Sequence, residues 1–138
     1  MRFEGRVWKD KKSKYWLIEV PMLDIMTQGV SKKDAYRMIA DAIEVLIDQK
    51  GFKVNVRASD GSEFTVGANQ EKTLLALMLK RQREAHHLTL MEIAHRLHSK
   101  SPNAYARYEQ GKSVPTLDKL NHLMKAIHPR LEPVFKMA

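Results

Sequence analysis

The sequence predicts an α+β protein in two parts: a small N-terminal sheet-and-helix domain, residues 1–68, and an all-α domain, residues 69–138. Two observations predict this division. Apolar residues alternate in short runs around a single helical segment up to Gly67, whereas after Asn69 they return every three or four residues. The charge divides in the same way, because residues 72–138 hold 12 lysines and arginines against 5 acidic residues, a net +7 within a total of +8.

The length and composition limit the possible classes of protein. The 138 residues are enough for one ordinary domain or two very small ones. No apolar run approaches the roughly 18 residues that a membrane span needs. We therefore expect no membrane partner and a cytoplasmic location. The chain has no cysteine, which excludes disulfides, thiolate nucleophiles and cysteine-based zinc sites.

The N-terminal domain is expected to have the order βββαβ(β). Residues 2–9 and 15–20 are rich in aromatic and β-branched side chains and are joined by a polar turn, which predicts a hairpin. A third short strand over residues 25–28 ends at Gly29. After the helix, residues 52–66 alternate apolar side chains on both sides of the turn "SDGS", which predicts one or two further strands.

The helix of this domain is predicted by the segment "SKKDAYRMIADAIEVLIDQKG". Ser31 is expected to cap its start, with Asp34 three positions later, and Gly51 is expected to end it in a left-handed conformation. One stripe is predicted to face the sheet: Ala35, Ile39, Ala42, Ile43 and Leu46.

The carboxylates of this domain do not form a recognisable catalytic pattern. Asp10, Glu19, Asp24, Asp60 and Glu63 are scattered over turns and strand ends, with no spacing that guarantees a metal pair or an acid/base dyad. We therefore expect that the protein is not an enzyme and needs no cofactor.

A basic and aromatic hairpin followed by "TQGVSKKDAYRMIADAIEVLID" resembles the N-terminal domain of HicB-type antitoxins. The resemblance covers roughly the first half of the chain. It implies a partial ribonuclease-H-like sheet without catalysis. It also implies that residues 1–68 bind a small ribonuclease, a HicA-like toxin protein.

Four helices are predicted in the C-terminal domain. The first covers residues 72–85, and the second starts after Thr89, whose capping-box partner is Glu92. In the third, Ser101 is expected to be the cap and Pro102 the first helical residue. The fourth follows Thr116. The side chains expected inside the domain are Leu74, Leu77, Met78, Ala85, Tyr105, Tyr108, Leu117, Leu120, Leu123, Met124 and Ile127.

Two helices joined by a short turn, the second with a polar N-terminal end, match the geometry that places a recognition helix in the DNA major groove. The segments "KRQRE", "LTLMEIAHRLH" and "AYARYEQGKSVPTLDKL" are similar to the Cro and phage-repressor family, also called XRE-type regulators. The similarity implies double-stranded operator DNA as a partner and a homodimer or larger even oligomer. It also implies a structural pair between Arg83 and Glu109.

The third helix contains the predicted DNA-binding residues. Asn103 and Arg107 carry the amide and the guanidinium fork that suit adenine and guanine edges. Lys100, Ser101 and Lys112 flank the helix and are expected to contact phosphates. Ala104 and Ala106 belong to the same predicted contact surface.

The histidines do not predict a metal site. His86, His87, His95 and His98 lie near the second helix, but no HExxH pattern or acidic partner stands at ligand spacing.

Together the two resemblances predict an antitoxin that masks a HicA-like toxin and represses its own operon. Two alternatives stay open. The first is a stand-alone transcriptional regulator whose N-terminal domain senses a ligand, and the second is a nuclease that uses the carboxylates of the sheet.

Overall fold

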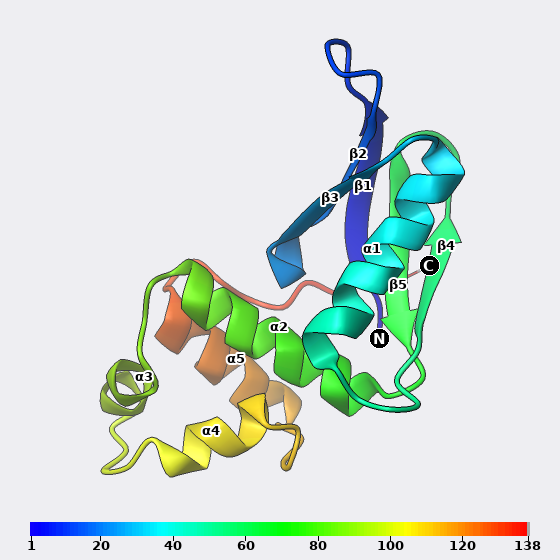
Figure 1. Cartoon of the computed structure of the whole chain (residues 1–138). Helices are drawn as coiled ribbons and strands as arrows, with labels where there is room; N and C mark the ends of the chain where they lie inside the picture. The colour runs from blue at the N-terminus through cyan, green and yellow to red at the C-terminus, as the bar shows by residue number, and fades with distance from the viewer. Residues whose placement is uncertain (138) are drawn as a thin grey trace. The chain divides into compact units, whose positions relative to one another are not determined.

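The computed structural model describes residues 1–137, which form two compact units, Met1–Leu74 and a second unit from Leu75 onward (Figure 1). The first unit contains a sheet and a helix and the second contains helices, so the predicted α+β class is confirmed. No helix in the described part of the chain has both the length and the apolar character that a membrane crossing requires.

The sheet of the first unit has five strands in the order β3-β2-β1-β5-β4, and every neighbouring pair is antiparallel. The hairpin after the helix supplies both β4 and β5, so the optional last strand of the prediction is present. The strands are β1 (Phe3–Lys9), β2 (Trp16–Val20), β3 (Ile25–Gly29), β4 (Val54–Ala58) and β5 (Glu63–Ala68). A short 3₁₀ helix, Pro21–Leu23, joins β2 to β3.

Helix α1 (Lys32–Ile47) lies across one face of this sheet (Figure 1). It buries Ala35, Ile39 and Ile43 completely. Because alternate residues of a strand point to opposite faces, the sheet supplies the other half of the core from every second position. These buried strand residues include Phe3, Val7, Ile18, Val20, Ile25, Phe64 and Val66.

The start of α1 has the predicted cap and its end does not. Ser31 Oγ accepts a hydrogen bond of 3.0 Å from the Asp34 N–H, and Asp34 Oδ2 accepts one of 2.9 Å from the Val30 N–H. The bond from Val30, together with the neighbouring Arg37, holds the pKa of Asp34 below its usual range. At the other end, Asp48 takes the left-handed conformation with φ 48°.

Two predictions for this helix end were therefore wrong. Gly51 has φ +83° but lies in a turn beyond the helix, because the bond from Asp48 N–H to Glu44 O already closes the last helical turn. Leu46 is 47% exposed, so the inward stripe ends one turn earlier than the periodicity indicated.

The connection from β3 to α1 requires a glycine. A Cβ atom on Gly29 would lie 2.4 Å from the backbone nitrogen of Ala35 and 2.7 Å from its Cα. Such distances are far below van der Waals contact, so the first turn of α1 packs directly against the end of β3. The "TQG" at the end of β3 thus has a steric reason for its last residue.

The second unit consists of four helices and an extended C-terminal segment. They are α2 (Glu71–Ala85), whose first turn belongs to the first unit, α3 (Leu90–Arg96), α4 (Asn103–Glu109) and α5 (Leu117–Ile127). Its fully buried side chains include Met78, Leu79, Ile93, Ala94, Leu123, Met124 and Ile127. Four of the side chains expected inside are not buried. Ala85 and Leu117, at helix ends, are exposed, and Tyr108 and Leu120 are half-buried.

Three helices of this unit end in the same way. His87, His98 and Gly111 have φ values of 56°, 56° and 68°, and the next residue donates its N–H to a carbonyl five positions back. This is the Schellman arrangement, in which a left-handed residue follows the helix. Glycine takes that conformation at little steric cost, whereas histidine does not.

Replacing His98 by glycine is therefore expected to stabilise the helical unit. The variant should gain about 0.5–1 kcal/mol, because it removes the steric cost of a Cβ atom in the left-handed region. Thermal unfolding should show a midpoint a few degrees higher. Gly111→Ala is the reciprocal variant and should lower the midpoint. A lower midpoint for His98→Gly would show that the imidazole makes a stabilising contact that outweighs the strain.

Candidate nucleic-acid interface

The first helix of the candidate interface, α3, has a well-defined start. Thr89 Oγ1 accepts a hydrogen bond of 3.1 Å from the Glu92 N–H, and Glu92 Oε2 accepts one of 3.3 Å from the Thr89 N–H. This reciprocal capping box satisfies two backbone donors that a helix start leaves unpaired. Ile93 and Ala94 then point into the core. The helix ends at Arg96, and His98 turns the chain toward α4.

Helix α4 begins at Asn103, one residue later than the sequence predicted. Pro102, and not Ser101, stands directly before it, in a helical conformation with φ −70°. The Ser101 hydroxyl still accepts a hydrogen bond of 3.2 Å from the Asn103 N–H. The Pro102 carbonyl accepts one of 2.9 Å from Ala106. Both groups satisfy donors of the first turn, so the local chemistry is that of a capped helix.

The outer face of α4 carries the predicted base-reading side chains. Asn103, Ala104 and Arg107 are exposed and Ala106 is half-buried. Tyr105 points inward and is only 2% exposed. Within residues 1–137, the side chains of Asn103 and Arg107 make no hydrogen bond or ion pair. Their polar groups are therefore available to a ligand.

Two lysines stand at opposite ends of α4. Lys100 lies in the turn before the helix and Lys112 follows Gly111 after it, and both side chains are exposed. The Lys112 backbone N–H donates to the Arg107 carbonyl at 2.9 Å, which fixes where the side chain leaves the helix end. Positive charge thus flanks the exposed face of α4 on both sides, as a phosphate-contacting surface requires.

The structure brings Arg83 of α2 and Glu109 of α4 together in a two-pronged ion pair. Arg83 Nε and Nη2 donate to the two carboxylate oxygens of Glu109 at 2.7 and 3.1 Å. The third nitrogen, Nη1, donates to the Leu88 carbonyl at 2.7 Å. The two side chains are only 12% and 7% exposed. The hydrogen bond to Glu109 raises the pKa of Arg83, because it favours the charged guanidinium.

This pair fixes the position of α4. Glu109 is the last residue of α4, and the Leu88 carbonyl belongs to the connection between α2 and α3. One guanidinium therefore holds three segments of the helical unit at once. Tyr105 lies beside the pair with a buried hydroxyl that has no hydrogen-bond partner within the described chain. Burial, and then the charge of Glu109, raises the pKa of Tyr105.

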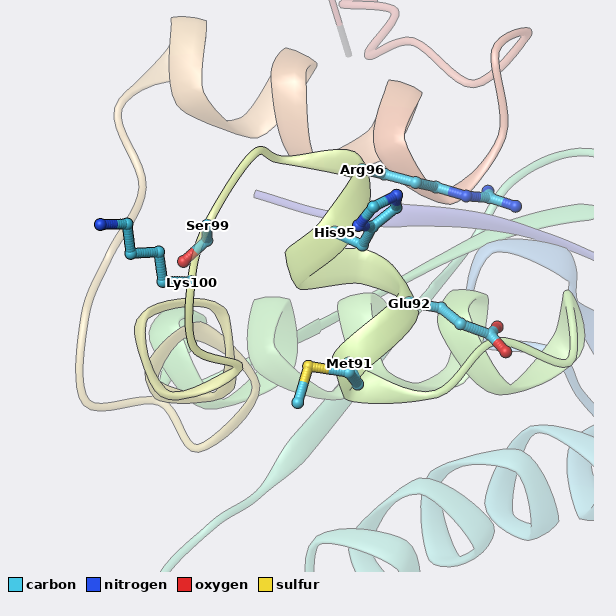
Figure 2. A pocket seen from close by; sticks show the side chains of 6 residues that line it. All are labelled: Met91, Glu92, His95, Arg96, Ser99 and Lys100. Atoms are coloured by element: carbon cyan, nitrogen blue, oxygen red, sulfur yellow. The ribbon is translucent and has the colours of Figure 1, made fainter.

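A shallow hollow of about 500 Å³ runs along the outer side of α3 (Figure 2). Arg96 is the best-defined residue of its lining, because its Nη1 donates to the carbonyls of Ala126 and Ile127 at 2.9 and 3.1 Å. A cation at the C-terminal end of α5 is favourable for the helix dipole. This role could not be predicted from the sequence, since an arginine that caps a distant helix looks like any surface arginine. The lining residues are Met91, Glu92, His95, Arg96, Ser99 and Lys100.

The histidines do not gather into a metal site. The rings of His86 and His128 are neighbours, with centroids 5.2 Å apart, and His86 Nδ1 lies 2.8 Å from the Gln82 carbonyl. Within residues 1–137, no group of three or more histidines and carboxylates is placed to hold a metal ion.

The comparison with known families decides what these helices are. Residues 79–128 match a family model described as Helix-turn-helix, which covers the second half of α2 and all of α3, α4 and α5. This segment is a Cro/C1-type helix-turn-helix. In helix-turn-helix motifs the second helix enters the major groove, and α4 occupies the position of that second helix. The protein therefore binds DNA and acts in transcription regulation. A search of curated proteins found no match for the chain.

Proposed function

We propose that the protein is the antitoxin of a toxin-antitoxin pair. In this proposal, residues 1–68 bind and mask a HicA-like ribonuclease toxin, and residues 69–138 repress the operon that encodes both proteins. The observation that carries it is the order of the two parts, a HicB-like sheet-and-helix domain followed by a Cro-type helix-turn-helix. This role places the protein in the cytoplasm, where the toxin meets its RNA.

The repressor half of the proposal rests on the exposed face of α4. Asn103 and Arg107 are the proposed base readers, because an amide and a guanidinium can each form paired hydrogen bonds with a purine edge. Lys100, Ser101 and Lys112 are proposed to contact phosphates, with Ala104 and Ala106 against the groove wall. Helix-turn-helix repressors read two half-sites, so we propose a homodimer or a larger even oligomer.

The masking half of the proposal rests on the first unit. The close packing of Gly29 against Ala35 and the cap at Ser31 give the HicB-like segment a defined shape. Masking needs a shaped surface and no catalytic group, which is consistent with carboxylates spread over separate strand ends and turns. The proposed mechanism is occlusion of the toxin's RNA-binding surface.

The test uses the full chain and the product of the reading frame beside its gene. We expect the two proteins to co-purify and the chain to stop RNA cleavage by its partner at equimolar ratio. Arg107→Ala is the matched control, because it should weaken DNA binding and leave protection of RNA unchanged. Continued RNA cleavage with the chain in excess would reject the masking role. If a small molecule then changed DNA affinity, the protein would be a ligand-sensing regulator.

A further inference from the structure

The turn between β1 and β2 concentrates the positive charge of the first unit. Residues 9–14, "KDKKSK", contain four lysines and one aspartate, a net charge of +3. The rest of Met1–Leu74 holds 9 basic and 10 acidic residues, a net charge of −1. The whole positive excess of this unit therefore lies in one six-residue tip.

Hydrogen bonds order the tip, and none of them involves a lysine side chain. The Asp10 N–H donates to the Tyr15 carbonyl at 2.8 Å, and Asp10 Oδ2 accepts bonds from the Ser13 N–H and hydroxyl at 2.9 and 2.5 Å. Lys14 closes the turn in a left-handed conformation with φ 64°. The one carboxylate is thus engaged by Ser13 and ties the turn together.

The four lysines are free for a partner. Lys9, Lys11, Lys12 and Lys14 are all exposed, and none of their ammonium groups makes a hydrogen bond or ion pair within residues 1–137. In the first unit the hairpin extends well past the N-terminal end of α1 and past the β4–β5 turn (Figure 1). Four unpaired ammonium groups on an ordered, protruding turn form a positively charged surface that attracts a polyanion.

We propose that the β1–β2 tip is a second, sequence-independent DNA contact that binds the phosphodiester backbone of duplex DNA. The inference rests on DNA binding by the helix-turn-helix, since that motif brings the duplex to the chain. The tip contains no arginine, asparagine or glutamine, the side chains that read base edges best. Lysine ammonium groups act as point charges and suit phosphates of any sequence.

Duplex DNA fits the tip better than a single strand does. Single-strand sites combine positive charge with open aromatic faces on which bases stack. Beside this tip, Tyr15 is exposed at 41%, whereas Trp8 and Trp16 are half-buried in strand positions. One open ring does not make the series of aromatic faces on which successive bases of a single strand stack.

The experiment compares two triple variants of the full chain that lose the same charge. The tip variant is Lys11→Gln, Lys12→Gln and Lys14→Gln. The control variant removes three other exposed lysines of the same unit: Lys33→Gln, Lys50→Gln and Lys72→Gln. Both are titrated with a random-sequence duplex, and separately with one of its single strands, at several salt concentrations, after equal melting temperatures have shown that both fold.

The slope of log K against log salt should become shallower by about 0.9 for each phosphate that the protein no longer neutralises, so by about 2–3 for the tip variant. The control should keep the wild-type slope.

An equal change of the slope in both variants would mean that only net charge matters, and it would overturn the proposal. An unchanged slope for the tip variant would overturn it as well. Loss of single-strand binding alone would overturn the duplex assignment. If the wild type bound no duplex at all, that result would contradict DNA binding by the helix-turn-helix, on which the proposal rests.

Discussion

Replacing Glu109 by alanine is expected to lower the free energy of unfolding of the helical unit by about 3 kcal/mol. The substitution leaves the Arg83 guanidinium in a site that is 12% exposed, with one hydrogen bond to the Leu88 carbonyl and only the weaker charge interaction with Glu84. Breaking a buried pair from one side costs about 3–5 kcal/mol, because the remaining charge stays desolvated. The lower part of that range applies, since Arg83 retains some solvent contact.

Two variants separate the charge from the rest of the side chain. Glu109→Gln keeps the shape and one hydrogen-bond acceptor, so it should lose less stability than Glu109→Ala. The double variant Arg83→Ala with Glu109→Ala should lose less than the sum of the single variants, because no unpaired charge remains. Thermal and urea unfolding of the full chain measure all of these values. An unchanged melting temperature for Glu109→Ala would show that the pair does not hold α4 in place.

Replacing Gly29 by alanine is expected to destabilise the first unit by about 3 kcal/mol. The new Cβ atom would lie 2.4 Å from the Ala35 nitrogen, and backbone atoms on two packed elements cannot move apart without opening the start of α1. Inserting a methyl group into a packed interior costs about 1–3 kcal/mol of stability. The cost here should lie at the upper end of that range, because the atoms that clash are backbone atoms of Asp34 and Ala35. The far-ultraviolet circular dichroism melt should show an earlier transition.

Gly61→Ala is the matched control for Gly29→Ala. Gly61 has φ +82° and no heavy atom within 4 Å of the site where a Cβ would stand. It should cost only the strain of a left-handed alanine, about 1 kcal/mol. Equal destabilisation by the two alanines would contradict the close packing of β3 against α1.

The order of the elements follows from the sequence because the local signals agree with one another. Alternating apolar residues predicted the strands, and the Thr89–Glu92 spacing marked the start of α3 correctly. The ends of helices were harder to place. Asp48 and His98 take left-handed conformations that glycine usually adopts, because backbone bonds to Glu44, Ala94 and neighbouring carbonyls stabilise the conformation. No residue-type preference reveals that balance.

The candidate site could be predicted where it depends on chemistry carried by one short helix. Asn103 and Arg107 lie on the outer side of α4 because Tyr105, on the opposite side, is buried. Interactions between distant segments could not be derived from periodicity. The pairing of Arg83 with Glu109 came from a family resemblance, and the bond from Arg96 to the end of α5 came only from the structure. Such bonds depend on how the helices pack and not on local sequence.

The central claim is that α4 reads DNA bases while its flanks hold phosphates. The most direct measurement titrates Asn103→Ala and Lys112→Ala proteins with the duplex upstream of the gene and with a scrambled duplex, at several salt concentrations. Asn103→Ala should cost about 1–3 kcal/mol on the upstream duplex and leave scrambled binding unchanged. Lys112→Ala should weaken both duplexes equally and make the salt slope shallower by about one. Equal weakening of both duplexes by Asn103→Ala, or a base-specific effect of Lys112→Ala, would contradict this placement of the recognition helix.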